Sequence, residues 1–289
     1  MSRASKRDHI LVGLDIGTTK ICAIVAEVPE EGPLNIIGVG SCPSRGLRKG
    51  VVVNIESTVE SIKKAVEEAE LMAAVQINSV YTGIAGSHIS GENLKGVVAL
   101  KKQEVTRDDI SRAVESARTL AVIPHERRIL HVLPREFMVD DQEGVREPLG
   151  MSGNRLEVNV HVITGAVTSA QNIIKSVNRA GLDVVDIILQ PLASSEAVLS
   201  AEERELGVAM VDLGGGTTDL AIFLDGSIRH TAVLPIGGQN LTKDLAIGLL
   251  TSQTDAEKIK VQHGIARTEL VHGHQMVEVP SVGDRPPRQ

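Results

Sequence analysis

The chain contains very few aromatic residues: no Trp, one Tyr and two Phe among 289 residues. Proteins that bind single-stranded nucleic acid usually stack the bases on aromatic side chains, so this class of protein is disfavoured. The formal net charge of −7 argues in the same direction, because binding to a phosphate backbone relies on clustered positive charge. We therefore expect no nucleic-acid partner.

Long apolar runs and targeting signals are also missing. No stretch of about 18 apolar residues is present to span a membrane, and the polar start "MSRASKRDH" lacks the apolar core of a secretion signal. Cys22 and Cys42 could form a disulfide, but their apolar surroundings are more typical of reduced thiols in a cytosolic protein. With 42% hydrophobic and 23% charged residues, the composition predicts a cytoplasmic globular protein.

Hydrophobic periodicity predicts an α/β protein with an insertion. Residues 9–28 read as strand, turn and strand, and Ser57 with Glu60 forms a capping-box pattern that predicts a helix start. From about residue 86 the chain becomes polar and glycine-interrupted, and a helix from Thr106 precedes two alternating strands. We expect residues 86–163 to form an inserted subdomain, after which the main domain resumes.

Two stretches of the sequence have the same residue pattern. "VGLDIGTTKICAIV" (12–25) and "VDLGGGTTDLAIF" (211–223) each place an acid, Asp15 or Asp212, between an apolar strand and a glycine-containing turn. A single Asp-x-Gly turn is usually only a hairpin, but three consecutive glycines weaken strand ends unless something must approach the backbone. The pair predicts a duplicated phosphate site, with one hairpin in each half of the molecule.

A nucleotide with a magnesium ion suits these residue types. Glycine lets an anion approach the backbone N–H groups, and the threonines add hydroxyl donors. The acids would repel phosphate, but they can anchor Mg²⁺ through its water shell, because this ion keeps most of its hydration and needs only one or two carboxylates.

Other chemical motifs receive no support. The chain has no Gly-Lys pair and hence no Walker-type loop, and it has no G-x-S-x-G, H-E-x-x-H or C-x-x-C motif. His272 and His274 could hold a metal, but no neighbouring Cys or carboxylate completes a ligand pattern, which favours a solvated loop.

The two hairpins resemble the phosphate motifs of the actin, Hsp70 and sugar-kinase superfamily, and longer stretches resemble the FtsA family of bacterial cell-division proteins. These stretches are "LVGLDIGTTKICAIVAEV", "GLRKGVVVNIESTVESIKKAVEEAE", "VYTGIAGSHISGENLKGVVAL" and "VAMVDLGGGTTDLAIFLDGSIRHTAVLPIGGQNLTKDLA". The resemblance covers the chain from about residue 8 and implies an α/β, actin-like (ribonuclease H-like) two-lobed fold with an inserted subdomain. It assigns residues 1–85 plus 164–205 to the first lobe, 86–163 to the insertion, 206–236 to the start of the second lobe, and 237–289 to a partial subdomain.

The resemblance also implies ATP and Mg²⁺ as cofactors and a role for each matching residue. Asp15 and Asp212 would hold Mg²⁺ through water. Gln190 would orient the attacking water, the alternative being a polar residue that merely ends a strand before Pro191. Glu257 would contact ribose or adenine, although Thr254 and Glu257 also match a capping box. The β- and γ-phosphates would be lined by Gly17, Thr18, Thr19, Lys20, Gly214, Gly215, Gly216, Thr217 and Thr218.

The pattern departs from the resembled family after about residue 264. Members of that family continue with a glycine-rich adenosine motif and finish with an amphipathic helix that docks on the membrane, and neither pattern occurs before Gln289. We expect a C-terminally truncated chain with an incomplete second lobe, weak or no ATP binding, and no membrane contact of its own.

Two classes of function are compatible with the hairpins. The resemblance implies an ATP-binding scaffold, at most a slow ATPase, that links the tubulin-like division-ring protein FtsZ to the cytoplasmic membrane at midcell. It would self-associate into filaments and recruit later division proteins through residues 86–163. The alternatives are a small-molecule kinase of the same superfamily, which needs an Asp as general base in the cleft, and a pilus-assembly actin homologue.

Overall fold

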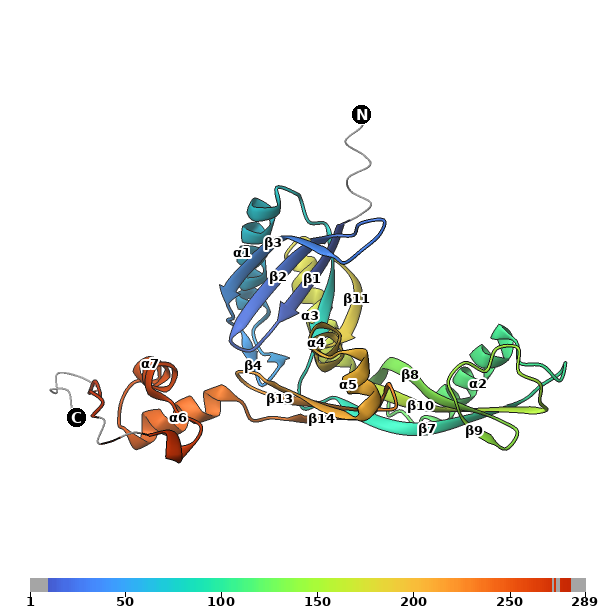
Figure 1. Ribbon diagram of the computed structural model, residues 1–289. Coiled ribbons are helices and arrows are strands. Elements are labelled where there is room, and N and C mark those ends of the chain that lie inside the picture. Colours follow the sequence, from blue (N-terminus) through green and yellow to red (C-terminus); the bar gives the residue numbers. More distant parts are fainter. Residues whose placement is uncertain (1–9, 272, 274–275, 282–289) are drawn as a thin grey trace. The chain divides into compact units, whose positions relative to one another are not determined.

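The computed structural model describes residues 10–271, 273 and 276–281 (Figure 1). The chain divides into two compact units, Met1–Pro235 and Ile236–Gln289. The first unit contains three main sheets, and the second is helical in its described part. His272 and His274, considered above as metal ligands, lie outside the described residues.

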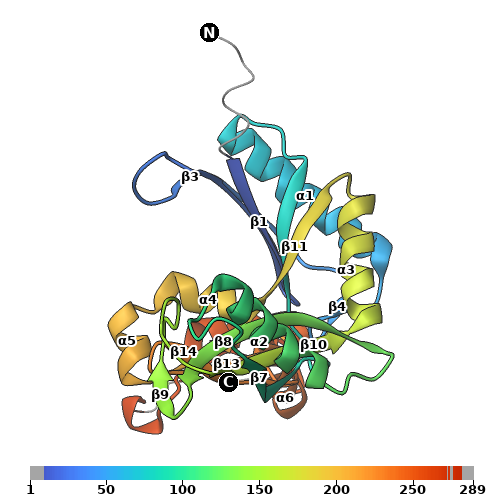
Figure 2. The same ribbon diagram turned by 90° about the vertical axis from the view of Figure 1, so that its right-hand side faces the viewer.

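A five-stranded sheet with helices on one face forms the largest core of the first unit. Its strand order is β11-β6-β1-β2-β3, in which β1, β2 and β3 are antiparallel while β6 and β11 run parallel to β1. Helices α1 and α3 cover the same face (Figure 2). The elements are β1 (Ile10–Ile16), β2 (Lys20–Glu27), β3 (Asn35–Pro43), β6 (Ser79–Ile84), β11 (Asp183–Leu189), α1 (Ile55–Ala73) and α3 (Val167–Arg179), with a small ribbon of β4 (Leu47–Arg48) and β5 (Val51–Val52).

Strand alternation in β1 decides which side chains face the helices. Val12, Leu14 and Ile16 are buried in the core under α1 and α3. Because successive side chains of a strand point to opposite faces, Gly13 and Asp15 project from the other face. The first hairpin, β1–β2, therefore presents its acid away from the core.

Helix α1 lies unusually close to the edge strand β3. A Cβ atom at Gly40 would stand 1.9 Å from the carbonyl oxygen of Ala65, so only glycine allows this approach. The outer edge of β3 is hydrogen-bonded by the same helix: the backbone N–H of Val39 donates to Met72 Sδ (3.3 Å) and that of Ser41 to Glu68 Oε2 (2.7 Å).

The prediction that α1 begins at Ser57 is wrong, because the helix begins earlier in the chain. The helix begins at Ile55, and Asn54 is its N-cap, whose side chain accepts from the backbone N–H of Ser57. Asn and Ser are comparable N-caps, so the local pattern alone did not separate the two choices.

A four-stranded sheet, in the order β7-β10-β8-β9, packs against helix α2. The strands and helix predicted between residues 106 and 166 are present, and Thr106 caps α2 in a capping box with Asp109. The polar, glycine-interrupted stretch after residue 86 proves to contain a ten-residue strand. The elements are β7 (Ser90–Ala99), α2 (Arg107–Leu120), β8 (Arg127–Val139), β9 (Gln142–Val145) and β10 (Arg155–Ala166).

A three-stranded antiparallel sheet completes the first unit. Strands β12 and β13 form the second hairpin, and β14 pairs with β13. Met210, Ala221, Phe223 and Ile228 make a small core on one face, onto which Leu192 and Leu199 pack. The elements are α4 (Gln190–Val198), α5 (Ala201–Leu206), β12 (Val208–Leu213), β13 (Thr218–Leu224) and β14 (Ser227–Leu234).

The second unit contains α6 (Gly238–Gly248), α7 (Gln253–His263) and the short 3₁₀ helix η1 (Thr268–Leu270). The N-cap of α7 is Ser252, which accepts from the backbone N–H of Asp255. A capping box of Thr254 with Glu257 is therefore not formed. In the described part of the chain, no helix combines the length and the low polarity needed to cross a membrane.

Candidate functional site

The two hairpins close with the same backbone contact. In the first, the N–H of Gly17 donates to the carbonyl of Lys20 at 3.0 Å, and in the second the N–H of Gly214 donates to the carbonyl of Thr217 at 2.9 Å. Each acid stands two positions before its glycine and is the next-to-last residue of its strand. The duplicated sequence pattern thus corresponds to a duplicated turn.

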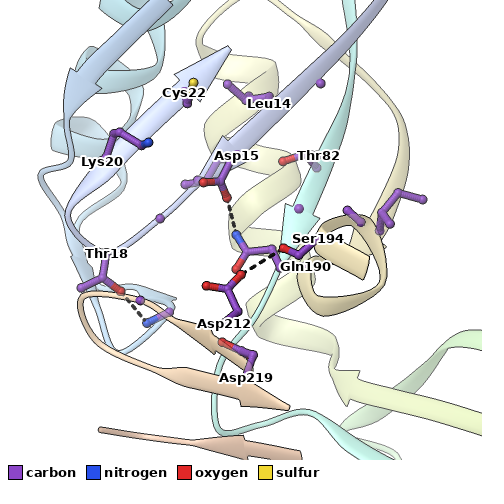
Figure 3. A pocket seen from close by; sticks show the side chains of 18 of the residues that line it. Leu14, Asp15, Thr18, Lys20, Cys22, Thr82, Gln190, Ser194, Asp212 and Asp219 are labelled. Atoms are coloured by element: carbon purple, nitrogen blue, oxygen red, sulfur yellow. Dashed lines mark hydrogen bonds between the residues drawn. The ribbon is translucent and has the colours of Figure 1, made fainter. Parts of the chain in front are cut away.

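Both acids line one cavity of about 560 Å³ in the first unit (Figure 3). This volume is within the range of small-molecule sites, about 300–1,000 Å³. The structure brings together most of the residues predicted from the sequence: Asp15, Gly17, Thr18, Thr19, Lys20, Gln190, Asp212, Gly214, Gly215 and Thr217.

The remaining predicted residues have different positions. Gly216 is not a lining residue, but it packs against Thr18, whose Oγ1 would be 2.8 Å from an added Cβ. Thr218 begins β13 and pairs in register with Leu213 and Leu234. Glu257 belongs to the second unit, where its carboxylate accepts from the Thr242 hydroxyl and from Lys260 Nζ. These contacts hold the pKa of Glu257 below its ordinary value.

Glycine is required where the hairpins touch. A Cβ at Gly215 would stand 2.3 Å from Thr19 Cγ2, and one at Gly17 would stand 2.8 Å from the carbonyl oxygen of Lys20. Thr18 adds a further connection, because its Oγ1 accepts from the backbone N–H of Gly50 at 3.1 Å. A larger side chain at Gly215 would push the two hairpins apart, whereas one at Gly17 would strain the turn of the first hairpin itself.

Two carboxylates of the cavity, Asp15 and Asp219, lie in surroundings that raise their pKa. Asp15 is reached by solvent through the cavity, yet loss of hydration raises its pKa, an effect that Lys20 opposes and Asp212 reinforces. Asp219 lies directly opposite Asp212 in the β12–β13 register and is 3% exposed. Burial raises the pKa of Asp219 to about 6, although Thr217 Oγ1 donates to its Oδ2 at 3.0 Å.

Helix α4 contacts the acids of both hairpins. Gln190 Nε2 donates to Asp15 Oδ1, and Ser194 Oγ donates to Asp212 Oδ2 at 3.0 Å (Figure 3). Gln190 is thus the first residue of a helix and not the end of a strand. Gly83 on β6 makes room for it, because an added Cβ would stand 2.8 Å from Gln190 Cγ.

Sequence reasoning missed several lining residues. Asp219 was visible as the second acid of its stretch, but nothing in the pattern showed that it is buried beside Asp212. Thr82 and Ser194 come from β6 and α4, far from either hairpin in sequence, and carry no motif of their own. Only the fold reveals them.

These residues fit a nucleotide with Mg²⁺. The glycines leave room for an anion where side chains cannot stand. Two buried oxygens in the cavity wall, Thr82 Oγ1 and Asp219 Oδ1, have no hydrogen-bonding partner among the described residues. Because buried polar groups are normally hydrogen-bonded, a ligand bound in the cavity would supply the missing partners. No group of three or more His, Cys, Asp or Glu side chains that could hold a metal ion occurs in the described ranges.

Comparison with protein families gives two matches. Residues 86–164 match the model described as the SHS2 domain inserted in FTSA, and residues 209–289 match the model described as cell division protein FtsA. The first match covers most of the four-stranded sheet, and the second includes the glycine-rich hairpin.

Solved structures show the same fold at low identity. PilM, from the PilM-PilN type IV pilus biogenesis complex, aligns over 88% of this chain and 70% of its own with a TM-score of 0.65 and 19% identity. MreB5 of Spiroplasma citri bound to AMPPNP aligns over 97% of this chain and 70% of its own with a TM-score of 0.52 and 14% identity. The fold is therefore α/β and actin-like with an inserted domain.

Similarity to curated proteins is much higher. The cell division protein FtsA of Pseudomonas aeruginosa is 54% identical over 97% of this chain and 67% of its own length. That of Escherichia coli K12 is 49% identical over 100% of this chain and 68% of its own. The chain spans about two thirds of the length of these relatives, and it belongs to the FtsA family of cell-division proteins.

Proposed function

We propose that the chain holds Mg²⁺-ATP between its two hairpins and serves as a nucleotide-binding scaffold in cell division. The observation that carries the proposal is the single cavity lined by Asp15, Asp212 and the glycine turns of both hairpins. The division role rests on family membership, which favours this scaffold over a sugar-type kinase or a pilus-assembly protein.

The proposal gives several residues that line the cavity a role. Lys20 and the Thr18 and Thr19 hydroxyls lie beside the glycines, where they would donate to phosphate oxygens. Thr217 would line the same space, while its hydroxyl donates to Asp219. Bound Mg²⁺ would neutralise phosphate charge, and Asp15 and Asp212 would hold its water shell. Gln190 would position a water through its carbonyl oxygen, since its amide nitrogen donates to Asp15. Any hydrolysis would be slow.

Glu257 keeps its proposed contact with ribose or adenine. The alternative explanation, a helix cap, is removed because Ser252 and Asp255 form the cap of α7. Its bonds to Thr242 and Lys260 support a fixed carboxylate on the helix pair of the second unit.

We extend the proposal to partners as the family suggests. Residues 1–85 with 164–205 form the first lobe and 206–236 begin the second. Residues 86–163 mediate self-association and recruit later division proteins, and 237–289 contribute to the site for the tubulin-like ring protein FtsZ. The scaffold would act on the cytoplasmic face of the inner membrane at midcell.

Calorimetric titration with AMPPNP into the millimolar range, with Mg²⁺ or with EDTA, tests the nucleotide site. We expect Asp15→Asn and Asp212→Asn to lose the Mg²⁺-dependent part of the affinity, while the control Asp183→Asn, an exposed carboxylate at the start of β11, behaves as wild type. Unchanged Mg²⁺ dependence in both cavity variants would refute the site.

Fluorescence microscopy tests the scaffold role. A tagged chain fused to the C-terminal region of a relative should form midcell rings. Diffuse signal together with sugar-dependent ATP turnover would favour the kinase instead.

A further inference from the structure

One face of helix α4 reaches both metal-side carboxylates. Gln190 and Ser194 are four residues apart, so they lie on the same side of the helix, one turn from each other. The first donates to Asp15 of the first hairpin and the second to Asp212 of the second hairpin. In Figure 3 the two side chains point toward the space between the acids. A single rigid element therefore bridges the two halves of the cavity.

The position of α4 is fixed by contacts outside the cavity. Leu192 packs against the small core of the three-stranded sheet. Arg204 Nη2 of α5 donates to the carbonyl of Ser195 at 2.8 Å, which ties α4 to the next helix. With the helix held in this way, the Ser194 hydroxyl has little freedom relative to Asp212.

A hydroxyl in this place fixes the rotation of the Asp212 carboxylate, because it donates to Oδ2. The bond engages one of the two carboxylate oxygens of a residue that lines the cavity, so the other oxygen stays available to a ligand there. A carboxylate held in one orientation can meet the water shell of a cation without first being ordered.

We propose that Ser194 is a positioning residue that orients Asp212 for the Mg²⁺ ion of the bound nucleotide. The inference rests on the proposed nucleotide function. It assigns to α4 a double task, since Gln190 and Ser194 together set the orientation of both carboxylates.

The experiment compares AMPPNP affinity with Mg²⁺ and with EDTA, by calorimetry on the full 289-residue chain. Ser194→Ala should reduce the enhancement of affinity by Mg²⁺ by about fivefold to tenfold, the worth of one typical hydrogen bond. Its affinity in EDTA should stay within about twofold of wild type. Ser194→Thr retains the hydroxyl and should restore the enhancement.

Ser195→Ala is the matched control, because it removes a hydroxyl from the same turn that bonds only the carbonyl of Pro191 within its own helix. Thermal unfolding of all variants separates loss of fold from loss of metal response. If wild type and Ser194→Ala show the same enhancement by Mg²⁺, the positioning role is wrong while the nucleotide site stands. If wild type binds AMPPNP under neither condition, the proposed function fails and this inference fails with it.

Discussion

His161 on β10 and Thr231 on β14 are joined by a buried hydrogen bond of 2.9 Å between Nε2 and Oγ1. The other ring nitrogen, Nδ1, lies 2.7 Å from Asn93 Oδ1. Since the Asn93 amide nitrogen donates to the carbonyl of Arg229, its oxygen is the acceptor, and Nδ1 carries the proton. A neutral histidine thus links the four-stranded sheet to the sheet that contains the second hairpin.

Removing the hydroxyl of this link should destabilise the protein. Thr231→Val keeps the shape but leaves the buried Nε2 of His161 without its donor, which costs about 1–3 kcal/mol of unfolding free energy. Urea titration of Thr231→Val, His161→Leu and the double variant gives the coupling energy, with the exposed Thr119→Val as control. Additive effects of the two substitutions would contradict the link.

Acidification should weaken the same link. Burial first, and then the positive charges of Arg135 and His230, lower the pKa of His161 from 6.5 to about 4. The unfolded chain binds this proton at higher pH than the folded chain does, so the contribution of His161 is complete above about pH 6.5 and is lost as pH falls toward 4.

The comparison of wild type with His161→Gln isolates this effect from other titrating groups. Between about pH 7 and 4, wild type should lose about 3 kcal/mol more unfolding free energy than the variant. Parallel stability curves would show that the histidine titrates normally.

Closing the space at Gly215 should separate the hairpins. Gly215→Ala places a methyl group 2.3 Å from Thr19 Cγ2. Overpacking of this kind costs about 1–3 kcal/mol, and the same cost to the nucleotide-binding arrangement of the hairpins lowers AMPPNP affinity by about fivefold to a hundredfold. Thr19→Ser removes Cγ2 and should recover part of that loss in the double variant. Gly248→Ala, where a Cβ meets no atom within 4 Å, is the control.

Helix α7 should depend on Ser252 and not on Thr254. Ser252→Ala removes the acceptor of the Asp255 backbone N–H, 3.1 Å away, and should lower the local opening free energy of α7 by about 1 kcal/mol. Native-state hydrogen exchange at the Asp255 amide measures this change. An equal loss in Thr254→Ala would restore the capping role first considered for that residue.

The hairpins could be predicted from sequence because their information is local. An apolar strand, an acid, a glycine turn and a second strand follow one another within about fifteen residues, so the pattern determines the turn. Strands β8 and β10 were predictable for the same reason, since apolar residues alternate from Leu156 to Val162. The alternation did not reveal that both faces of β10 are largely buried.

Strand β7 could not be recognised because its glycines serve distant contacts. A Cβ at Gly96 would stand 2.0 Å from the carbonyl oxygen of Ala113 in α2, and one at Gly91 would meet Thr231 Oγ1 at 2.5 Å. In the sequence these glycines indicate a loop. In the fold they allow helix α2 and strand β14 to approach β7 closely. The bond from Ser194 to Asp212 was hidden similarly, since it depends on how α4 packs against β12.

The hydrogen bonds that α1 makes to the edge of β3 affect more than this one chain. Met72 and Glu68 occupy the outward N–H groups of Val39 and Ser41, and Pro43 has no N–H to offer. A foreign strand laid along β3 would find these donors already used, so the edge resists the zipper-like growth that leads to irreversible aggregation. A second copy that approached this edge would have to bind through side chains, and such a contact could come apart without breaking a shared sheet.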